Sequence, residues 1–422
     1  MTATPTIQPT TVAPAWWVRP GLEVDDGRLV IAGREAEALA REHGTPLYVY
    51  DLERYAENAR RFHEAFARHP GLTFRLRFAM KAGPDAAILR AFRALGEHGS
   101  VETVGIDACS PGEVLRALEC GYAPSEISYT GTNLSERDLD VILAQPGLHL
   151  NLDAISQIHR VGRRAPGRPI GLRVNPGSGA GYNEKLEYAG DKPTKFGIYD
   201  DRLEEAVAVA QSYDLTIDTL HFHAGSGWLA EGLPAFEDAL KRATAMARRL
   251  LELGCPLAEV NVGGGLGAPG RDGEIPVSLD DYAAVLARHL GPLGVTIACE
   301  PGDHLARDAG LLLAEVVTVE DRGSSRFIGV DAGWNLLCGY FIYGFLNEVV
   351  PCREPFAERT WTVALAGHIN EAHDLFAQDY PFPPVAEGDI VAILGTGSYA
   401  AAMSSTHCLR PQAPALYLRR TS

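Results

Sequence analysis

The sequence predicts an α/β protein in which an N-terminal (β/α)8 barrel is followed by an all-β domain, either a barrel or a sandwich. Two observations predict this architecture. From Thr45 to about Asp303, short β-rich runs alternate with amphipathic helix patterns, as strands and crossover helices do in parallel sheets. After Asp303, β-like runs follow one another with few helix patterns between them. An open doubly wound sheet remains the alternative for the first part.

The change of pattern divides the chain into four segments. Residues 1–20 are expected to be a flexible tail, because the stretch up to Pro14 is rich in Thr and Pro. Residues 21–44, which contain the turn signal Asp25-Asp26-Gly27, are expected to join the C-terminal β domain. The barrel is expected over residues 45–303 and the β domain over residues 304–422.

The expected elements alternate in chain order. Strand-like runs in the first part are Leu47–Tyr50, Phe74–Met80, Ile127–Thr130, Leu148–Leu152, Pro169–Val174, Ile217–His223, Glu259–Val262 and Val295–Glu300. Helix patterns are Leu52–His69, Asp85–Leu95, Pro111–Cys120, Arg202–Ser212, Pro234–Gly254 and Leu279–Leu290. Ser110 is placed to cap a helix that starts at Pro111 and carries Glu113 three residues after the cap. Expected strands of the β domain are Leu311–Val319, Arg326–Val330, Thr360–Ala366, Asp389–Leu394 and Ala415–Leu418.

Charge and cysteine usage exclude several classes of function. The 422-residue chain carries a formal net charge of −16, which argues against binding to nucleic acid or to an anionic membrane surface. No apolar run approaches the ~18 residues that a membrane-spanning helix needs. The seven cysteines form no Cys-x-x-Cys pair and no zinc-like spacing. We therefore expect reduced thiols, a cytoplasmic location and no metal site.

Chemically reactive residues lie at the ends of four expected strands. Lys81 follows one strand, His223 and Glu300 end two others, and the glycines 263–265 follow the fourth. Because the carboxyl ends of barrel strands meet at one face, we expect these residues to share a site. A lysine there can form a Schiff base with a cofactor aldehyde, and unshielded glycine N–H groups can bind a phosphate.

These four segments, in this order, resemble the alanine-racemase-like class (fold type III) of pyridoxal-phosphate enzymes, and within it the diaminopimelate and ornithine decarboxylase family. The resemblance extends from Thr45-Pro46-Leu47-Tyr48-Val49-Tyr50-Asp51 to Ala402-Met403-Ser404-Ser405 and Leu409-Arg410-Pro411. It implies pyridoxal 5′-phosphate as cofactor, an amino acid as substrate and α-decarboxylation as the reaction. It also implies a homodimer in which the β domains help to form two shared sites.

The resemblance implies a role for each site residue. Lys81 would hold the cofactor as a Schiff base, and His223 would stack on its ring. Glu300 would keep the pyridine nitrogen protonated, so that the ring draws electrons from a carbanion at Cα. The phosphate would be bound by Ser226, Gly263, Gly264, Gly265 and Tyr399. An acid, an arginine and a structural histidine are expected nearby, namely Asp107, Arg173 and His221.

Three positions on the substrate side depart from the family pattern. Asp303 stands where the family has the arginine of Glu-Pro-Gly-Arg, and Gly339, ahead of Tyr343, stands where it has a second arginine. An arginine would hold a distal carboxylate by charge-assisted hydrogen bonds, whereas Asp303 would repel one. Asn370 replaces a cysteine that assists protonation after loss of CO2, while the neighbouring Glu371 is retained.

From these departures we expect a substrate with an amine or a neutral polar distal end, and not meso-diaminopimelate. Its partners would be Asp303, Asp331, Tyr343, Asn370 and Glu371, the last two also acting in catalysis from the partner subunit. Lys81, Tyr343 or His373 would replace the cysteine as proton donor. Alternatively, a lysine screens Asp303, which then says nothing about the substrate. Two other functions stay open: a racemase or epimerase with Tyr343 as second base, and a catalytically silent regulator that binds the cofactor.

Overall fold

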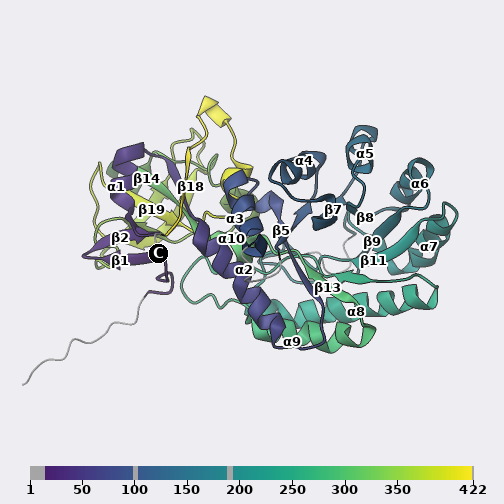
Figure 1. The fold of residues 1–422 in the computed structure, drawn as a ribbon. Coiled ribbons are helices and arrows are strands. Elements are labelled where there is room, and N and C mark those ends of the chain that lie inside the picture. The colour runs from purple at the N-terminus through teal and green to yellow at the C-terminus, as the bar shows by residue number, and fades with distance from the viewer. Residues whose placement is uncertain (1–14, 98–102, 188–192, 421–422) are drawn as a thin grey trace, which may run out of the picture.

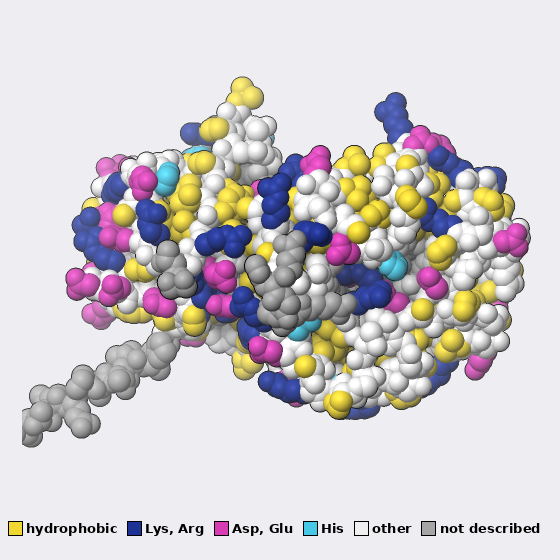
Figure 2. All heavy atoms as spheres, in the orientation of Figure 1, with side chains coloured by type: hydrophobic (Ala, Val, Ile, Leu, Met, Phe, Trp, Pro, Cys, Tyr) yellow, Lys and Arg dark blue, Asp and Glu magenta, His cyan; other side chains and the backbone are white. Residues whose placement is uncertain are grey.

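The structure, a computed structural model, describes residues 15–97, 103–187 and 193–420. Figure 1 shows a barrel with its ring of helices beside a second body that is built mainly of strands. Most of the expected tail over residues 1–20 lies outside the described residues. Within them, no helix is long and apolar enough to cross a membrane. On the face in Figure 2, acidic and basic side chains are interspersed over both bodies.

The barrel sheet is parallel and closed, which confirms the predicted (β/α)8 architecture. Its strand order is β9-β11-β12-β13-β5-β6-β7-β8, and the pairing of β8 with β9 closes the ring. The strands are β5 (Phe74–Ala79), β6 (Gly105–Ala108), β7 (Ile127–Gly131), β8 (His149–Leu152), β9 (Pro169–Asn175), β11 (Thr216–His221), β12 (Glu259–Asn261) and β13 (Thr296–Cys299). A short β10 (Ile198–Tyr199) extends the sheet beside β9.

Helices follow the barrel strands and bury one face against them. They are α2 (Leu52–Ala67), α3 (Ala86–Glu97), α4 (Pro111–Glu119), α5 (Glu136–Leu143), α6 (Ile155–Arg164), α7 (Leu203–Gln211), α8 (Leu233–Glu252), α9 (Leu279–Leu290) and α10 (Asp303–Ala306). In α8, Phe236, Leu240, Ala243 and Ala247 recur at helical spacing and are fully buried. The predicted cap of α4 is confirmed, because the Ser110 side chain accepts the first-turn N–H of residue 113.

The second body is an all-β domain, as predicted. Its sheet has the order β16-β19-β14-β15-β17-β18; a further strand, β4, joins it at β14, and β20 pairs with β4. The strands are β4 (Leu47–Asp51), β14 (Gly310–Arg322), β15 (Ser325–Val330), β16 (Val349–Pro351), β17 (Trp361–Ala366), β18 (Leu375–Phe382), β19 (Ile390–Leu394) and β20 (Ala415–Leu418). The remaining helical segments are α1 (Ala36–His43), α11 (Cys338–Tyr343) and the 3-10 turns η1 (Met80–Ala82), η2 (Pro124–Glu126), η3 (Asp200–Arg202), η4 (Ala230–Gly232), η5 (Gly291–Leu293), η6 (Arg307–Ala309), η7 (Ala401–Met403) and η8 (His407–Leu409).

One strand lies in a different sheet from the one that the alternating pattern suggested. β4 was expected to begin the barrel, but it pairs antiparallel with β14 and parallel with β20 in the β domain. Its place in the barrel is taken by β6, which was not predicted. β6 has only four residues, including Gly105 and Asp107, so it lacks the β-rich run that reveals longer strands.

The segment before β4 packs on the β domain. β1 (Leu22–Asp25), β2 (Arg28–Ile31) and β3 (Arg34–Glu35) form a small sheet, and the β1–β2 turn has positive φ at Asp26 and Gly27. Its side chains share a core with strands β14 and β19. A single bridge joins Arg28 to Arg353.

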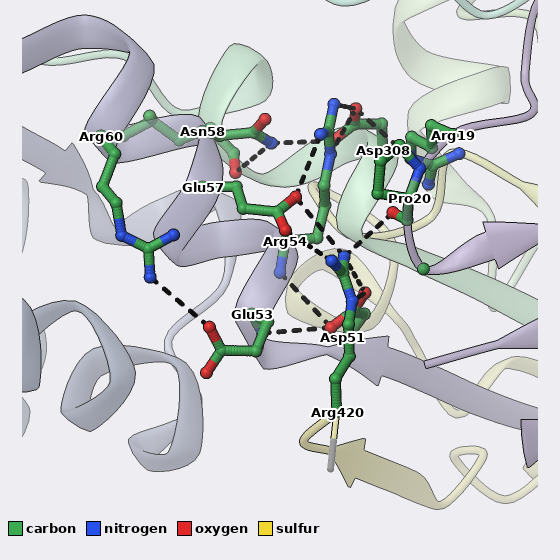
Figure 3. A network of polar contacts seen from close by, with 12 residues as sticks. Arg19, Pro20, Asp51, Glu53, Arg54, Glu57, Asn58, Arg60, Asp308 and Arg420 are labelled. Atoms are coloured by element: carbon green, nitrogen blue, oxygen red, sulfur yellow. Dashed lines mark hydrogen bonds and ion pairs between the residues drawn. The ribbon is translucent and has the colours of Figure 1, made fainter. Parts of the chain in front are cut away.

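A polar network lies where the two bodies meet (Figure 3). Asp308, which follows the barrel, accepts hydrogen bonds from Arg54 at 2.6 Å and from Asn58 at 2.8 Å, and Arg19 lies 3.6 Å away. Burial alone would raise the pKa of Asp308, but the two arginines outweigh it and hold the pKa well below its usual range. Arg420 at the other end of the chain binds the nearby Asp51. The network joins both ends of the chain to α2.

Candidate active site

Both bodies of the protein fix the position of Lys81. Lys81 lies on η1, directly after β5 and at the carboxyl end of the barrel strands. The N–H of Ala79 donates to the carbonyl of Pro301, and the N–H of Tyr399 in the β domain donates to the carbonyl of Ala82 at 2.9 Å. The lysine side chain is 49% exposed because it projects into a cavity of about 410 Å³.

This cavity brings most of the predicted site residues together. The predicted residues in its wall are Lys81, Asp107, Arg173, His221, His223, Ser226, Gly264, Gly265, Glu300, Asp303, Tyr343 and Tyr399. They come from different barrel strands and from two loops of the β domain. The (β/α)8 closure therefore produces the shared site that was expected from strand ends alone.

An ion pair sets the charge of Lys81. Its Nζ lies 3.2 Å from Oδ2 of Asp107, the inward residue of the next strand. Desolvation alone would lower the pKa of Lys81, but the carboxylates of Asp107 and Glu300 hold it well above its usual value. Lys81 is therefore an ammonium here, and Asp107 is the acceptor within reach when that amine has to become a nucleophile.

Two neutral donors hold Glu300. His221 Nε2 donates to one carboxylate oxygen at 2.9 Å, and Asn261 Nδ2 donates to the other at 2.5 Å. Burial alone would raise the pKa of Glu300, but these donors and the nearby Arg77 charge keep it well below its usual range. His221 itself is neutral, because burial lowers its pKa and its buried Nδ1 has no hydrogen-bond partner. A proton on Nδ1 would be an unsatisfied buried donor.

His223 is also neutral. Burial lowers its pKa well below the usual value, and the positive charges of Arg173 and Lys81 lower it further. Its Nε2 lies 3.1 Å from the hydroxyl of Ser226. An uncharged imidazole in this wall can lie flat against an aromatic ring without an ion's cost of desolvation.

The glycine loop after β12 leaves no room for side chains. A Cβ on Gly264 would lie 2.3 Å from the carbonyl oxygen of Glu300, and one on Gly265 would lie 2.2 Å from that of Gly225. Gly263 and Gly265 have positive φ. Only glycine therefore lets this backbone face the cavity, which is how a phosphate can approach main-chain N–H groups.

The partners of the Asp303 carboxylate are groups of the protein itself. Its Oδ1 accepts from the Ser398 hydroxyl at 2.6 Å, its Oδ2 accepts from the Ala268 N–H at 3.1 Å, and Arg307 Nη1 lies 3.6 Å away. The screening cation is thus an arginine one helical turn further on. Asp303 fastens α10 to the β domain, and its charge does not reach a substrate unopposed.

Four predicted site residues are not in the cavity wall. Gly263 lies below it, where its N–H binds Asn261 Oδ1 and its carbonyl accepts the N–H of Glu300. Asp331 accepts the N–H of Glu315 in the β domain. Asn370 and Glu371 are exposed between β17 and β18, and Glu371 lies 3.3 Å from Nε2 of His407. The structure of one chain does not bring this pair to its own cavity.

Some residues of the site were missed from the sequence. Asn261 and the wall residues Thr130, Leu186, Phe196 and Phe345 had no motif to reveal them. The sequence did offer a signal for Asn261. It precedes Gly263 by two residues, and residues two apart on a strand face the same side, so its side chain could have been expected near the site. His221 had been predicted as structural, and its bond to Glu300 makes it the residue that orients the carboxylate.

Comparison with known proteins identifies the family. Residues 52–307 match the family model for the pyridoxal-dependent decarboxylases, pyridoxal binding domain. A diaminopimelate decarboxylase of Methanothermobacter thermautotrophicus is 36% identical over 410 residues, which cover 95% of this chain and 93% of that protein. One from Streptomyces coelicolor is 33% identical, covering 90% of this chain and 86% of that protein.

Solved structures agree with the whole architecture. Diaminopimelate decarboxylase from M. jannaschii in co-complex with L-lysine has a TM-score of 0.85 at 25% identity, covering 94% of this chain and 93% of that one. The enzyme from Helicobacter pylori, complexed with L-lysine, has a TM-score of 0.82 at 28% identity, covering 91% and 94%. These relatives contradict the expectation that meso-diaminopimelate is not the substrate. That expectation was wrong in its premise, because Asp303 is paired internally.

Pyridoxal phosphate fits the residues of this cavity. The Lys81 amine can hold the aldehyde, the glycine loop lines the wall with backbone because its packing admits no Cβ, and Glu300 is an oriented carboxylate. Tyr399 and Ser226 add hydroxyl groups to the same wall. A P-loop lysine is absent from the glycine-rich segment. The chain belongs to the pyridoxal-dependent decarboxylase family and is a pyridoxal-phosphate-dependent amino-acid decarboxylase.

Proposed function

We propose that this protein decarboxylates diaminopimelate, removing one α-carboxylate as CO2 and leaving lysine. The observation that carries the proposal is the match to relatives of that name over up to 95% of the chain. The geometry supports it, because Arg307 neutralises Asp303, the one acid that argued against a substrate with a distal carboxylate. Arg173 adds a positive charge to the cavity wall.

The bound cofactor supplies an electron sink for the pair left on Cα when CO2 departs. Lys81 would hold the cofactor aldehyde, and Asp107 would take the proton that the Lys81 ammonium must lose to become a nucleophile. Glu300, oriented by His221 and Asn261, would serve the ring nitrogen. His223 would provide a neutral surface for the ring.

Protonation of Cα needs a donor inside the cavity. Three groups are candidate donors: Lys81 and Tyr343 line the cavity of their own chain, whereas His373 lies outside it, on the exposed loop that carries Glu371. We assign the step to Lys81, whose ammonium is stabilised by Asp107 at 3.2 Å. The proton leaves Nζ for Cα, which leaves Lys81 as the neutral amine that it must be to hold the cofactor aldehyde again.

The test follows CO2 and lysine together. Purified protein loaded with pyridoxal phosphate is given meso-diaminopimelate, L-ornithine, L-arginine and L-lysine, and both products are measured. Lysine should form from diaminopimelate in a one-to-one ratio with CO2, and Lys81→Ala should form none. Faster CO2 release from ornithine or arginine than from diaminopimelate would overturn the substrate assignment while leaving the reaction intact.

We also propose that two copies of the chain share their active sites. The Asn370–Glu371 loop is exposed and lies outside its own cavity. Beside it, the segment around η8 projects from the β domain (yellow in Figure 1): His407 lies 3.3 Å from Glu371, and Leu409 is 92% exposed. Burial of this large apolar side chain in a partner surface would favour association.

Subunit complementation tests the shared site. Lys81→Ala and Glu371→Gln are each expected to be nearly inactive alone, because the first lacks the amine and the second the partner's acid. Mixed and allowed to exchange subunits, they should recover up to about a quarter of wild-type activity, since half of the random dimers contain one native site. No recovery from variants that do exchange subunits would mean that each site is built by one chain.

A further inference from the structure

The barrel interior below the cavity contains a buried ion pair. Arg77 on β5 and Glu259 on β12 form two parallel hydrogen bonds of 2.6 and 2.9 Å, and their side chains are 3% and 7% exposed. Barrel cores are usually filled by branched aliphatic side chains. A buried ion pair is a poor source of stability, because apolar residues of similar volume often stabilise a protein as well or better. The position of the pair therefore needs another reason.

The pair joins the two strands on either side of the strand that leads to Glu300. β13 lies between β5 and β12, and Glu300 is the residue that follows β13. The register pairs Cys299 with Leu76, so the next residues along each strand, Glu300 and Arg77, lie side by side. On the other side, Glu259 precedes by two residues Asn261, which donates to Glu300. The pair and the Glu300 carboxylate thus form two adjoining layers of one polar core.

The charges of these layers are complementary. The two groups bonded to Glu300 are the Asn261 amide and the His221 imidazole, whose pKa is lowered by burial, so neither is a permanent cation. Arg77 brings a formal positive charge into the same low-dielectric interior, on the adjacent strand. A buried carboxylate with neutral donors alone would tend to take up a proton, whereas a cation beside it favours the ionised form. Glu259 in turn fixes the guanidinium through two hydrogen bonds.

We propose that Arg77, anchored by Glu259, is a positioning residue that keeps Glu300 ionised and in place for the ring nitrogen of the cofactor. This inference rests on the proposed role of Glu300. It adds to that role a second layer of the barrel, which acts through Glu300 and touches neither cofactor nor substrate. In this arrangement Arg77 favours the protonated cofactor ring indirectly, through Glu300, and lies further from the reacting atoms than Glu300 does.

Two single variants of the same pair separate electrostatics from structure. Arg77→Gln and Glu259→Gln each break the same two hydrogen bonds, but they remove charges of opposite sign. Arg77→Gln should shift the absorbance spectrum of the bound cofactor and its pH titration, and lower kcat roughly tenfold with little change in KM, less than loss of a direct donor. Glu259→Gln leaves the Arg77 charge beside Glu300, so its spectrum should stay close to that of the wild type. Arg77→Lys should recover most of the wild-type spectrum.

Equal effects of Arg77→Gln and Glu259→Gln on the spectrum would mean that the pair acts only through structure, and would overturn the inference. If either single variant does not fold, Arg77→Met/Glu259→Leu replaces the pair by apolar side chains. That double variant should show the shifted spectrum, and a wild-type spectrum with wild-type kcat would refute the proposal. Glu300→Gln is measured in parallel. A changed spectrum in Glu300→Gln but not in Arg77→Gln refutes only this inference, whereas no change in either refutes the role of Glu300.

Discussion

Replacing Asp303 by asparagine distinguishes two interpretations of this position. In the structure the carboxylate holds Ser398, the Ala268 N–H and Arg307, so Asp303→Asn should weaken the protein. If Asp303 instead faced the substrate as a repelling charge, the same change would improve the binding of diaminopimelate. The two interpretations therefore predict different effects of the same substitution: a less stable protein in the first case, and tighter binding of diaminopimelate in the second.

The expected loss of stability follows from the contacts. Arg307 is 3% exposed and would lose its counter-ion, which for a closely bonded buried pair costs about 3–5 kcal/mol. The 3.6 Å separation of Arg307 and Asp303 is too long for a strong hydrogen bond, and the asparagine oxygen can still accept from Ser398 or from Ala268. We therefore expect Asp303→Asn to lower the free energy of unfolding by about 2–3 kcal/mol.

Urea unfolding and steady-state kinetics measure both consequences on one preparation. Asp321→Asn is the matched control, because Asp321 binds Arg326 at 2.7 Å on the exposed surface, where loss of an ion pair changes stability little. A wild-type unfolding midpoint for Asp303→Asn, together with a several-fold lower KM for diaminopimelate, would refute the structural role of Asp303.

Three further predictions concern the cofactor site and the junction between the two bodies. Lys81→Ala should lose the absorbance band of the Schiff base and the label that borohydride fixes in the wild type. Glu300→Gln should bind cofactor but turn over about a hundredfold more slowly, since an amide cannot keep the ring nitrogen protonated and ~3 kcal/mol of carbanion stabilisation is lost. Asp308→Asn should cost about 1–2 kcal/mol near neutral pH, discounted because the Asp308 side chain is 30% exposed. The pKa of Asp308 is lowered in the fold, so its contribution is complete above the unfolded value of about 3.9 and disappears as pH falls below it.

Each of these predictions has a result that contradicts it. A borohydride-stable label elsewhere than Lys81 would place the Schiff base on another lysine. Near-normal turnover of Glu300→Gln would exclude it as the partner of the ring nitrogen. For Asp308, urea unfolding of variant and wild type is compared between pH 7 and pH 3, and a stability difference that grows toward acid would have the wrong sign.

The sequence by itself determined the architecture and the identity of the chemical groups. Alternating strand and helix patterns are local properties of ten or twenty residues, so they predicted the barrel, the β domain and the cap at Ser110. The same locality placed Lys81, His223 and Glu300 at strand ends. Because every strand of a parallel barrel ends at one face, local positions were enough to predict that these three residues meet.

The tertiary structure decided what each group touches. The partner of Asp303 in the β domain, Ser398, lies 95 residues away, and its buried neutraliser, Arg307, matches no motif. β4 was wrongly assigned to the barrel because its pairing partners, β14 and β20, are distant in the chain and a local pattern does not reveal them. Arg77 lies beside Glu300 only because barrel closure makes β13 and β5 neighbours. The sequence shows which residues carry a charge, but the effect of that charge on a substrate depends on the partners that the fold brings to it. The substrate was therefore misjudged from Asp303 alone.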